Sequence, residues 1–474
     1  MTKACIVHVL GAFAPRVVDI RGIFAFAKIP LLFALVACKG GGEPPGVTSS
    51  GPAATGTVAS TSAAADPAPS ASAAPPDSAP AKGQRPEIQG VLFLSIDSLR
   101  ADMPWAGYPR DIAPRLTALE KTCVSYTNAY SVSSYTAQSV AAFLASRLPS
   151  ELSRDGYFFQ KYAAGVTFFP ELLQKAGVFT AAAQAHGYFK RAGFEQGFDQ
   201  WELVPNLIWD ATTDKNITGP KHAEIAMRML VDPEILEKKR KFFEWFHLMD
   251  PHDLYQTHEK DGIEPLGKKP RDRYDNEVQF TDVQIGKILD HVKAQPYADK
   301  IAILISSDHG EAFGEHGRTR HAFELWQSLV RVPLMLCLPG AAPQRIDVPR
   351  SGIDIGPTVL ELLGVPASDA LSGKSLVAEA YGTAKPEERD VVLDLARTST
   401  NGQRRALIHG KHKIIQFDGS ITKTFDLEAD PEEAHELTGE VRDDMRARLK
   451  ETNAAIKDVP TTVCGKGCLE GTKN

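Results

Sequence analysis

The sequence predicts an α/β fold with a mainly parallel central sheet and helices on its faces. From residue 88 onward, apolar runs of strand length alternate with segments of helical periodicity, which is typical of a parallel sheet covered by helices. The chain has 474 residues, 43% of them hydrophobic, which is ample for one large globular domain or two unequal ones.

The first 38 residues are predicted to be a targeting segment rather than part of the fold. Arg16, Arg21 and Lys28 precede the apolar run IPLLFALVAC, which is too short to span a bilayer. Its ending LVAC is similar to the lipobox of bacterial lipoproteins, which implies cleavage before Cys38 and lipidation of Cys38. The alternatives are an ordinary cleaved signal peptide or a start codon assigned too early. The lipobox predicts an exported protein held to the membrane of the bacterial cell envelope by a lipid anchor, on its periplasmic or outer-membrane side.

Residues 39–85 are almost wholly Gly, Pro, Ala, Ser and Thr, a composition that cannot bury a core. We expect a disordered linker here that lets the domain range roughly 40 Å from the membrane. A catalytic domain is expected over residues 86–380, followed by a C-terminal subdomain and tail over 381–474.

Four cysteines lie beyond the signal segment. Cys464 and Cys468, in CGKGC, could close a small disulfide loop in an oxidising compartment, whereas a metal pair at this place lacks two further soft ligands nearby. Cys123 and Cys337 lie in apolar context and are expected to be small core residues rather than reactive thiols.

The net charge is −6 and the basic residues are dispersed along the chain. No electrostatic footprint for a polyanion such as nucleic acid stands out, and we expect no nucleic-acid partner.

Three strand-like runs end in acids and histidines. VLFLSID ends in Asp97, FFEWFHLMDPHD contains Asp250 and His252, and IAILISSDHGE contains Asp308 and His309. Ligands of open α/β sheets bind beyond the carboxyl ends of the strands, so these side chains are expected to converge there. Each acid alone could equally cap the next helix.

Two carboxylates and an imidazole from this set suit a divalent cation. Asp97, Asp308 and His309 are therefore predicted to bind Zn, Mn or Ca.

The stretch SSYTAQSVAAFLASRLP predicts a helix with Thr136 in its first turn. Ala137, Val140, Ala141 and Leu144 recur at helical spacing, and Ser133 or Ser134 is available as N-cap. A nearby cation and the positive end of the helix dipole both favour an alkoxide, so Thr136 is a candidate nucleophile.

Nine blocks follow one another along the chain over roughly residues 88–455. They are SIDSLRAD, YTNAYSVSSYTAQSVAAFLASRLPS, GVFTAAAQAHGYFKRAGFEQGFDQW, HLMDPHDLY, SSDHGEAFGEHG, RVPLMLCLPG, DIGPTVLELLGVP, GKHKIIQ and FDLEADPEEAHEL. In order and spacing these blocks resemble the sulfatase family of the alkaline phosphatase superfamily. The resemblance implies the alkaline-phosphatase-like α/β fold, with a small C-terminal α+β subdomain built from an antiparallel sheet and a helix. It also implies a metal-dependent hydrolase acting on sulfate or phosphate esters of a small molecule, glycan or lipid.

The resemblance implies roles for individual residues. Asp97 matches the family's first metal-ligand acid, and Asp308 and His309 match its late ligand pair. His252 and His321 match positions that contact the transferred anion or the leaving group. With these two histidines, Asp250 could bind a second metal, although the spacing fits that arrangement poorly.

Departures from the family pattern affect the expected chemistry. Thr136 stands where sulfatases carry the residue that becomes formylglycine, and threonine cannot be converted to formylglycine. Gln138 replaces the family's proline and Val140 its anion-clamping arginine, while Ser139 is retained. Threonine at this position is similar to the phosphodiesterase, phosphonate hydrolase and phosphotransferase relatives, in which a metal-bound threonine is phosphorylated.

The prediction is therefore hydrolysis or transfer of a phosphoester group with Thr136 as metal ligand and nucleophile. In this mechanism His252 or His321 protonates the leaving oxygen. A catalytically silent, metal-holding envelope binding protein is the alternative, and a sulfatase working without formylglycine lacks any group to replace the nucleophile.

Other polar residues near these motifs have less definite roles. Arg318 and Arg320 are the nearest cations that could replace the missing arginine, and either could be surface charge or part of the second metal or substrate site. His186 could line the pocket or be structural. His316 and Glu311 are expected to shape the loop rather than to take part in catalysis.

Overall fold

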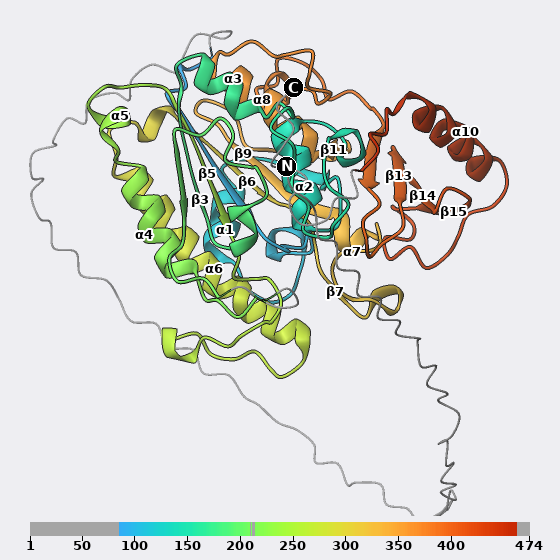
Figure 1. Cartoon of the computed structure of the whole chain (residues 1–474). Helices are drawn as coiled ribbons and strands as arrows, with labels where there is room; N and C mark the ends of the chain where they lie inside the picture. The colour runs from blue at the N-terminus through green and yellow to red at the C-terminus, as the bar shows by residue number, and fades with distance from the viewer. Residues whose placement is uncertain (1–84, 209, 211–213, 462–474) are drawn as a thin grey trace, which may run out of the picture. The chain divides into compact units, whose positions relative to one another are not determined.

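The structure, a computed structural model, describes residues 85–208, 210 and 214–461 (Figure 1). The predicted signal segment with Cys38, the linker up to residue 84, and Cys464 and Cys468 lie outside the described residues. Within the described part, no helix combines the length and the apolar composition needed to cross a bilayer.

The central sheet has nine strands, and every strand pairing in it is parallel except those made by β9. The strand order is β10-β2-β9-β6-β1-β5-β3-β4, with β11 also paired to β2. The predicted mainly parallel sheet is thus confirmed. Its strands are β1 (Gly90–Ile96), β2 (Val124–Tyr130), β3 (Phe179–Gln184), β4 (Gln200–Leu203), β5 (Phe242–Leu248), β6 (Ile301–Ser307), β9 (Arg331–Cys337), β10 (Gln344–Ile346) and β11 (Arg350–Ser351).

Strands β1 and β5 lie in the middle of the sheet and are buried along their whole length. Their sequences, GVLFLSI and FFEWFHL, are nearly continuous apolar runs, because helices cover both faces of the sheet. A polar residue in either strand is therefore isolated in the core unless it lies at an end of the strand.

Helices pack on both faces of the sheet. Phe169 of α3 packs edge-on against Phe243, whereas His222 of α4 packs against Phe246. Side chains three residues apart on a strand point to opposite faces, so α3 and α4 cover different faces. The helices are α1 (Pro114–Glu120), α2 (Thr136–Ala145), α3 (Phe169–Lys175), α4 (Gly219–Met229), α5 (Pro233–Leu236), α6 (Pro270–Lys293), α7 (Gln327–Val330), α8 (Ile355–Leu363), α9 (Val377–Ala380) and α10 (Glu440–Ala455).

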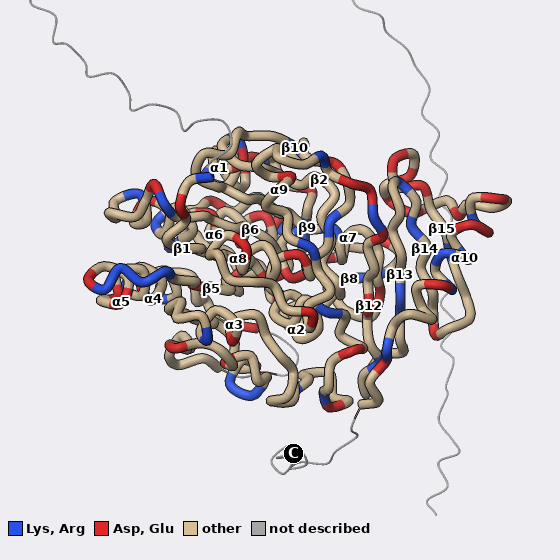
Figure 2. Tube along the Cα trace, turned by 90° about the horizontal axis from the view of Figure 1, so that it is seen from above, with Lys and Arg blue, Asp and Glu red and all other residues tan. Residues whose placement is uncertain are grey.

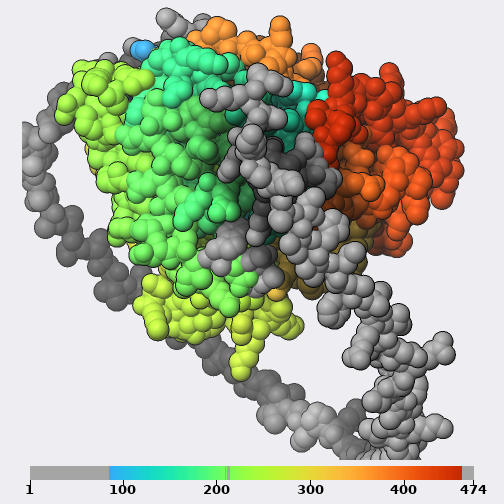
Figure 3. Space-filling view, in the orientation of Figure 1, coloured from blue at the N-terminus to red at the C-terminus, as the bar shows by residue number. Residues whose placement is uncertain are grey.

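The C-terminal part forms a second, antiparallel sheet with one helix, as predicted. Its strand order is β12-β13-β14-β15, and α10 packs on it through Met445 and Leu449. The bounds of the strands are β12 (Val391–Leu395), β13 (Arg404–His409), β14 (His412–Phe417) and β15 (Ile421–Asp426), and a separate small hairpin is formed by β7 (Ala312–Phe313) and β8 (Thr319–Arg320). Figure 3 shows the surface of this part in orange to red.

Cys123 and Cys337 form a disulfide, which the sequence did not predict. Strands β2 and β9 are antiparallel neighbours in which Val124 lies opposite Leu336, so the two cysteines face each other one step further along the pair. Both cysteines pack in or against the core, as expected. Their pairing could not be predicted, because 214 residues separate them and only the pairing of β2 with β9 brings them together.

Basic and acidic residues are scattered over the described backbone, and neither kind dominates the trace (Figure 2).

Candidate active site

The site is built at the carboxyl ends of three adjacent parallel strands. Asp97 directly follows β1 and Asp308 directly follows β6, while His247 is the penultimate residue of β5. The registers pair Ile96 with Ser307 and with Leu248, so the three side chains emerge at the same edge. One ligand atom from each of Asp97, His247 and Asp308 lies within 4.8 Å of the others, and all three residues are buried.

His247 was not among the residues predicted from the sequence. Its Nδ1 lies 2.7 Å from Oγ of Ser95, which also accepts a hydrogen bond from Nε1 of Trp245. Its Nε2 lies 3.2 Å from Oδ2 of Asp97. A histidine near the end of a mostly apolar strand was the signal available, since its strand ends at the same edge as Asp97.

The two carboxylates have opposite pKa shifts. Burial by itself raises the pKa of Asp97, but His252, His247 and His309 together hold it well below its usual range. Burial, reinforced by the charge of Asp97, raises the pKa of Asp308. Two carboxylates that lie this close together in a buried site require a neighbouring positive charge.

Two observations indicate that the site fits a divalent cation. Oδ2 of Asp308 is buried and has no hydrogen-bond partner, although buried polar atoms are normally paired. His309 completes the donor set, since its Nε2 lies 3.3 Å from this same oxygen and 3.8 Å from Oδ1 of Asp97. Oxygen and imidazole donors of this kind suit Zn, Mn or Ca.

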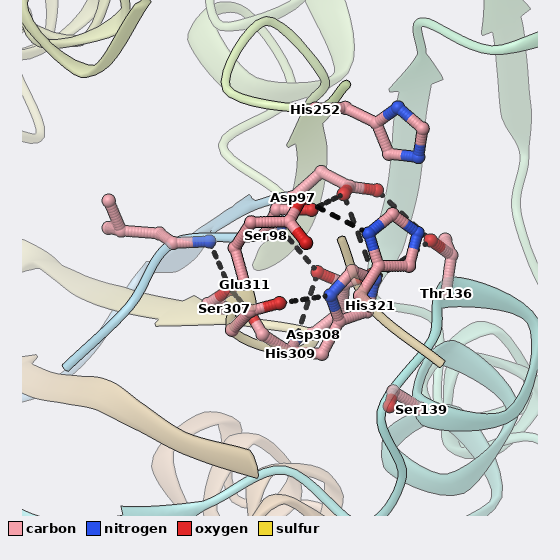
Figure 4. Close-up of polar contacts among 12 residues, drawn as sticks. Asp97, Ser98, Thr136, Ser139, His252, Ser307, Asp308, His309, Glu311 and His321 are labelled. Carbon is pink, nitrogen blue, oxygen red and sulfur yellow. Dashed lines mark hydrogen bonds and ion pairs between the residues drawn. The ribbon is translucent and has the colours of Figure 1, made fainter. Parts of the chain in front are cut away.

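Thr136 is the first residue of α2, and its hydroxyl faces this donor set (Figure 4). Oγ1 donates a hydrogen bond to Oδ2 of Asp97 at 3.0 Å and lies 3.3 Å from Nε2 of His309. The predicted N-cap at Ser133 or Ser134 was wrong, because the helix begins later, with Tyr135 as N-cap and no side-chain capping hydrogen bond. The hydroxyl of Ser133 instead donates to Oε1 of Gln138.

A row of imidazoles leads from this centre into an open cavity. The ring of His321 stacks on that of His309 with centroids 4.3 Å apart, and the ring of His252 follows at 4.8 Å. His186 lies 6.4 Å beyond His252. Burial lowers the pKa of His186 to about 4, so this imidazole is neutral at ordinary pH.

Glu311 contacts His321, contrary to its predicted role of shaping the loop. Oε2 of Glu311 lies 3.2 Å from Nδ1 of His321, and the carboxylate is fully buried. Burial lowers the pKa of His321, but Glu311 outweighs this and raises it to about 9. The sequence did not reveal the contact, because the chain passes through the β7–β8 hairpin before it returns to the site.

The segment that carries His321 has an unusual backbone. Arg320, Ala322 and Phe323 all have positive φ, with values of 66°, 70° and 65°. Left-handed conformations cost L-residues roughly 1–2 kcal/mol each. The amide of Ala322 donates to the carbonyl of Ser134 at 2.8 Å, which holds this segment against the start of α2.

Three of the other residues considered from the sequence, Asp250, Arg318 and His316, lie outside the ligand cluster. Asp250 turns away from the histidines, and its Oδ1 accepts hydrogen bonds from the amide and hydroxyl of Thr218. Arg318 pairs with Glu324 at 3.0 Å.

His316 stacks on Trp326 with the ring centroids 3.8 Å apart. Its Nε2 lies 2.9 Å from the carbonyl oxygen of Glu432, so this side chain ties the hairpin to the C-terminal part of the chain.

The reaction cavity has a volume of about 420 Å³, with Thr136 at its base. Arg320 lies at the cavity and forms an ion pair with Asp253 at 3.1 Å. Aromatic side chains make up much of the remaining wall, and they are Tyr135, Phe158, Phe159, Tyr188 and Phe323.

Comparison with known families agrees with this geometry. Residues 89–365 match the Sulfatase family, and residues 314–458 match the C-terminal region of N-sulphoglucosamine sulphohydrolase. The chain belongs to the sulfatase family. It is a sulfatase-family ester hydrolase with a buried Asp/His/Asp metal site.

Several relatives of this sulfatase-family chain are informative. A choline-sulfatase of Rhizobium meliloti (strain 1021) is 25% identical over 423 residues, covering 73% of this chain and 82% of the relative. The structure of Ps i-CgsB in complex with k-i-k-neocarrahexaose has a TM-score of 0.64 at 19% identity, covering 78% of this chain and 92% of the other. A phosphonate monoester hydrolase of Agrobacterium radiobacter has a TM-score of 0.61 at 16% identity, covering 77% and 95%. Both structures show the shared fold.

Gln138 and Val140 take up structural positions in this sulfatase-family site. Val140 is fully buried in the core. The side-chain amide of Gln138 pairs with the backbone of Ala396, donating from Nε2 to the carbonyl at 2.9 Å and accepting at Oε1 from the amide at 2.8 Å. Neither side chain supplies a cation to the cavity.

Proposed function

We propose that this protein is a metal-dependent hydrolase or transferase of phosphate ester or phosphonate groups, with Thr136 as the nucleophile. The observation that carries the proposal is the position of the Thr136 hydroxyl, at the start of α2 and in contact with both Asp97 and His309. A hydroxyl in such a place is activated by a neighbouring acceptor and by the positive end of the helix.

Asp97, His247 and Asp308 are the residues that would hold the metal, with His309 and Thr136 adjoining them. A divalent cation bound there supplies positive charge that lowers the pKa of a hydroxyl and neutralises the oxygens of the transferred group. The unpartnered oxygen of Asp308 supports this assignment.

The first half of the reaction transfers the group to Thr136. Oγ1 of Thr136 forms a bond to phosphorus and releases its proton to solvent, while the ionised Asp97 holds Oγ1 in position. The bond from phosphorus to the leaving oxygen breaks, and the imidazolium of His321 gives that oxygen a proton. His252 lies next to His321 and is the second candidate for this role.

The second half of the reaction restores the enzyme. Water, or another alcohol, attacks phosphorus and gives its proton to the neutral imidazole of His321. The bond from phosphorus to Oγ1 of Thr136 breaks, and this oxygen recovers a proton from solvent. Water as acceptor gives hydrolysis, and an alcohol gives transfer.

The residue in the place of formylglycine supports phosphoryl over sulfuryl chemistry. Threonine cannot provide the aldehyde hydrate on which the ordinary sulfatase reaction depends, whereas it can form a phosphoester. Solved phosphonate monoester hydrolases share the fold, so the fold is compatible with this chemistry.

One observation favours a second candidate, a metal-holding envelope protein without catalysis. Val140 occupies the place of the family's anion-clamping arginine and is fully buried, so that position offers the substrate no charge. In either case we propose export and lipid anchoring through Cys38. The Cys123–Cys337 disulfide supports export, because disulfides persist in oxidising compartments.

The test uses the full-length protein and its Thr136→Ala variant, each loaded in turn with Zn, Mn and Ca. Turnover is measured on an aryl sulfate, a phosphate monoester, a phosphodiester and a phosphonate monoester. Metal-dependent phosphoester or phosphonate turnover that is lost in Thr136→Ala is the expected result. Metal binding without turnover of any ester supports the binding protein, and turnover of the aryl sulfate alone contradicts the phosphoryl assignment.

A further inference from the structure

A second, larger concavity adjoins the reaction cavity. It has a volume of about 860 Å³, and its lining comes from the segments before α4, after β5, around the start of α6 and from the β7–β8 hairpin. Asp253 and Arg320 line both spaces, so the two adjoin at this ion pair. We call the larger space the lateral groove.

The charged side chains that line the lateral groove are mostly positive. Once Asp253 is balanced by Arg320, the remaining charged lining consists of Lys215, Lys268 and Arg273, and it contains no further carboxylate. The lining therefore carries three uncompensated positive charges beside the place where an anionic ester reacts.

These three cations form no ion pair within the described part of the chain. Lys215, Lys268 and Arg273 are exposed, and none has a carboxylate within 4.0 Å among residues 85–208, 210 and 214–461. Their neighbours differ in this respect, since Arg271 pairs with Asp102 and Asp275.

The three cations come from two separate segments of the chain. Lys268 and Arg273 flank Pro270, which begins α6, and Lys215 lies in the segment before α4. Like charges held together in one concavity repel one another unless an anion lies between them. The arrangement is therefore suited to receive anionic groups from outside.

We propose that the lateral groove binds a second anionic group of the substrate, so that the natural substrate is an extended molecule carrying several sulfate, phosphate or carboxylate groups. This inference rests on the proposed function, because it takes the Thr136 cavity as the place where one of these groups reacts. Leu254 and Phe313 also line the groove and offer apolar surface to the part of the molecule that joins its anionic groups.

The test measures binding separately from turnover. A fluorescein-labelled dextran sulfate oligosaccharide is titrated against four full-length, metal-loaded proteins, and fluorescence anisotropy gives the dissociation constants. The proteins are the wild type, Thr136→Ala, the groove variant Lys215→Ala/Lys268→Ala/Arg273→Ala, and the control variant Lys121→Ala/Lys175→Ala/Lys300→Ala. The control removes the same three charges from exposed positions that precede β2, β3 and β6, at the opposite edge of the sheet.

The groove variant is expected to bind the probe at least about tenfold more weakly than the wild type, with Thr136→Ala and the control variant within about twofold. Equal weakening in the groove and control variants, or no binding by the wild type, overturns the proposal. Either result is independent of whether any ester is hydrolysed.

A kinetic arm separates this inference from the proposed function. Bis(4-nitrophenyl) phosphate carries a single negative charge, so the groove variant should turn it over within about twofold of the wild-type kcat/KM. Dextran sulfate should inhibit the wild type competitively and the groove variant much less. If the wild type hydrolyses no ester, the proposed function fails. The anisotropy measurement still determines whether the lateral groove binds anionic groups.

Discussion

Glu311 and His321 form a buried pair in which the carboxylate lies 3.2 Å from Nδ1 of the imidazole. This contact overcomes burial and raises the pKa of His321 to about 9. An imidazole that is still protonated at neutral pH can donate to a leaving oxygen, and its other nitrogen remains available because Nδ1 is occupied by Glu311.

The pH profile tests this pair. The folded pKa of His321 is raised, so the protonated form is present below about pH 9 and is lost as the pH rises through that value. Glu311→Gln removes the charge that raises it, and the alkaline limb of kcat/KM should move to lower pH by about one unit or more. Glu432→Gln, at an exposed position, is the control and should leave the limb in place. An unchanged limb in Glu311→Gln contradicts the assignment of His321 as the acid.

Removal of the Thr136 hydroxyl should remove nearly all turnover. Thr136→Ala is expected to lower kcat by at least about 10³-fold, because the attacking oxygen is gone, whereas Thr136→Ser keeps part of the activity. Ser139→Ala is the matched control in the same helix, since its hydroxyl bonds only to the carbonyl of Ser133. It should retain activity within about tenfold of the wild type. Comparable losses in Thr136→Ala and Ser139→Ala indicate damage to α2 rather than loss of a nucleophile.

His247 should affect metal affinity although the family resemblance did not point to it. Its Nε2 lies next to Asp97, so His247→Gln is expected to weaken metal binding by about 10–100-fold. Metal content after dialysis against a graded chelator measures this directly. His222→Gln is the control, because His222 is equally buried but bonds to the carbonyl of Ala183 on the α4 face. Equal metal loss in both variants assigns the effect to folding.

Glu244 should make stability depend on pH. This residue lies within β5 with both carboxylate oxygens buried and without hydrogen-bond partners, and burial raises its pKa well above the usual value. Because the pKa of Glu244 is raised in the folded state, folding is most favourable when this carboxyl is protonated in both states, below its unfolded pKa of about 4.5. Its contribution to the free energy of unfolding is lost as the pH rises. Glu244→Gln cannot ionise, so its stability relative to the wild type should increase by more than about 1 kcal/mol between pH 5 and pH 8. Urea unfolding at both pH values measures the difference, and a gap that does not change with pH contradicts the assignment.

The Cys123–Cys337 disulfide should contribute to stability, because it closes a loop of 214 residues in the unfolded chain. Replacing both cysteines by serine is expected to lower the free energy of unfolding by about 2–5 kcal/mol. A reducing agent should lower the melting temperature of the wild type and leave that of the double variant unchanged. Equal sensitivity of both proteins to reduction shows that the bond makes no contribution.

The sequence predicted the parts of the site that follow from strand ends. Asp97, Asp308 and His309 each follow a recognisable apolar strand, and parallel strands that end at one edge bring such residues together. The first turn of α2 could likewise be predicted from the sequence, because the apolar residues that follow Thr136 recur with helical spacing.

Contacts made by chain reversal could not be predicted in this way. Glu311 reaches His321 only because a short hairpin turns back on itself, and Cys123 meets Cys337 only because β9 runs against its neighbours. Neither reversal leaves a periodic pattern in the sequence. His247 was overlooked for a different reason, since one polar residue in a buried strand is also what a satisfied core histidine produces.

The amide pair between Gln138 and Ala396 joins the first turn of α2 to the residue that follows β12, across 258 positions of the chain. Translation delivers the metal ligands and Thr136 long before it delivers Ala396. A chain truncated before β12 therefore holds the donor set without the backbone partner that fixes Gln138 in the first turn of α2, two residues from Thr136.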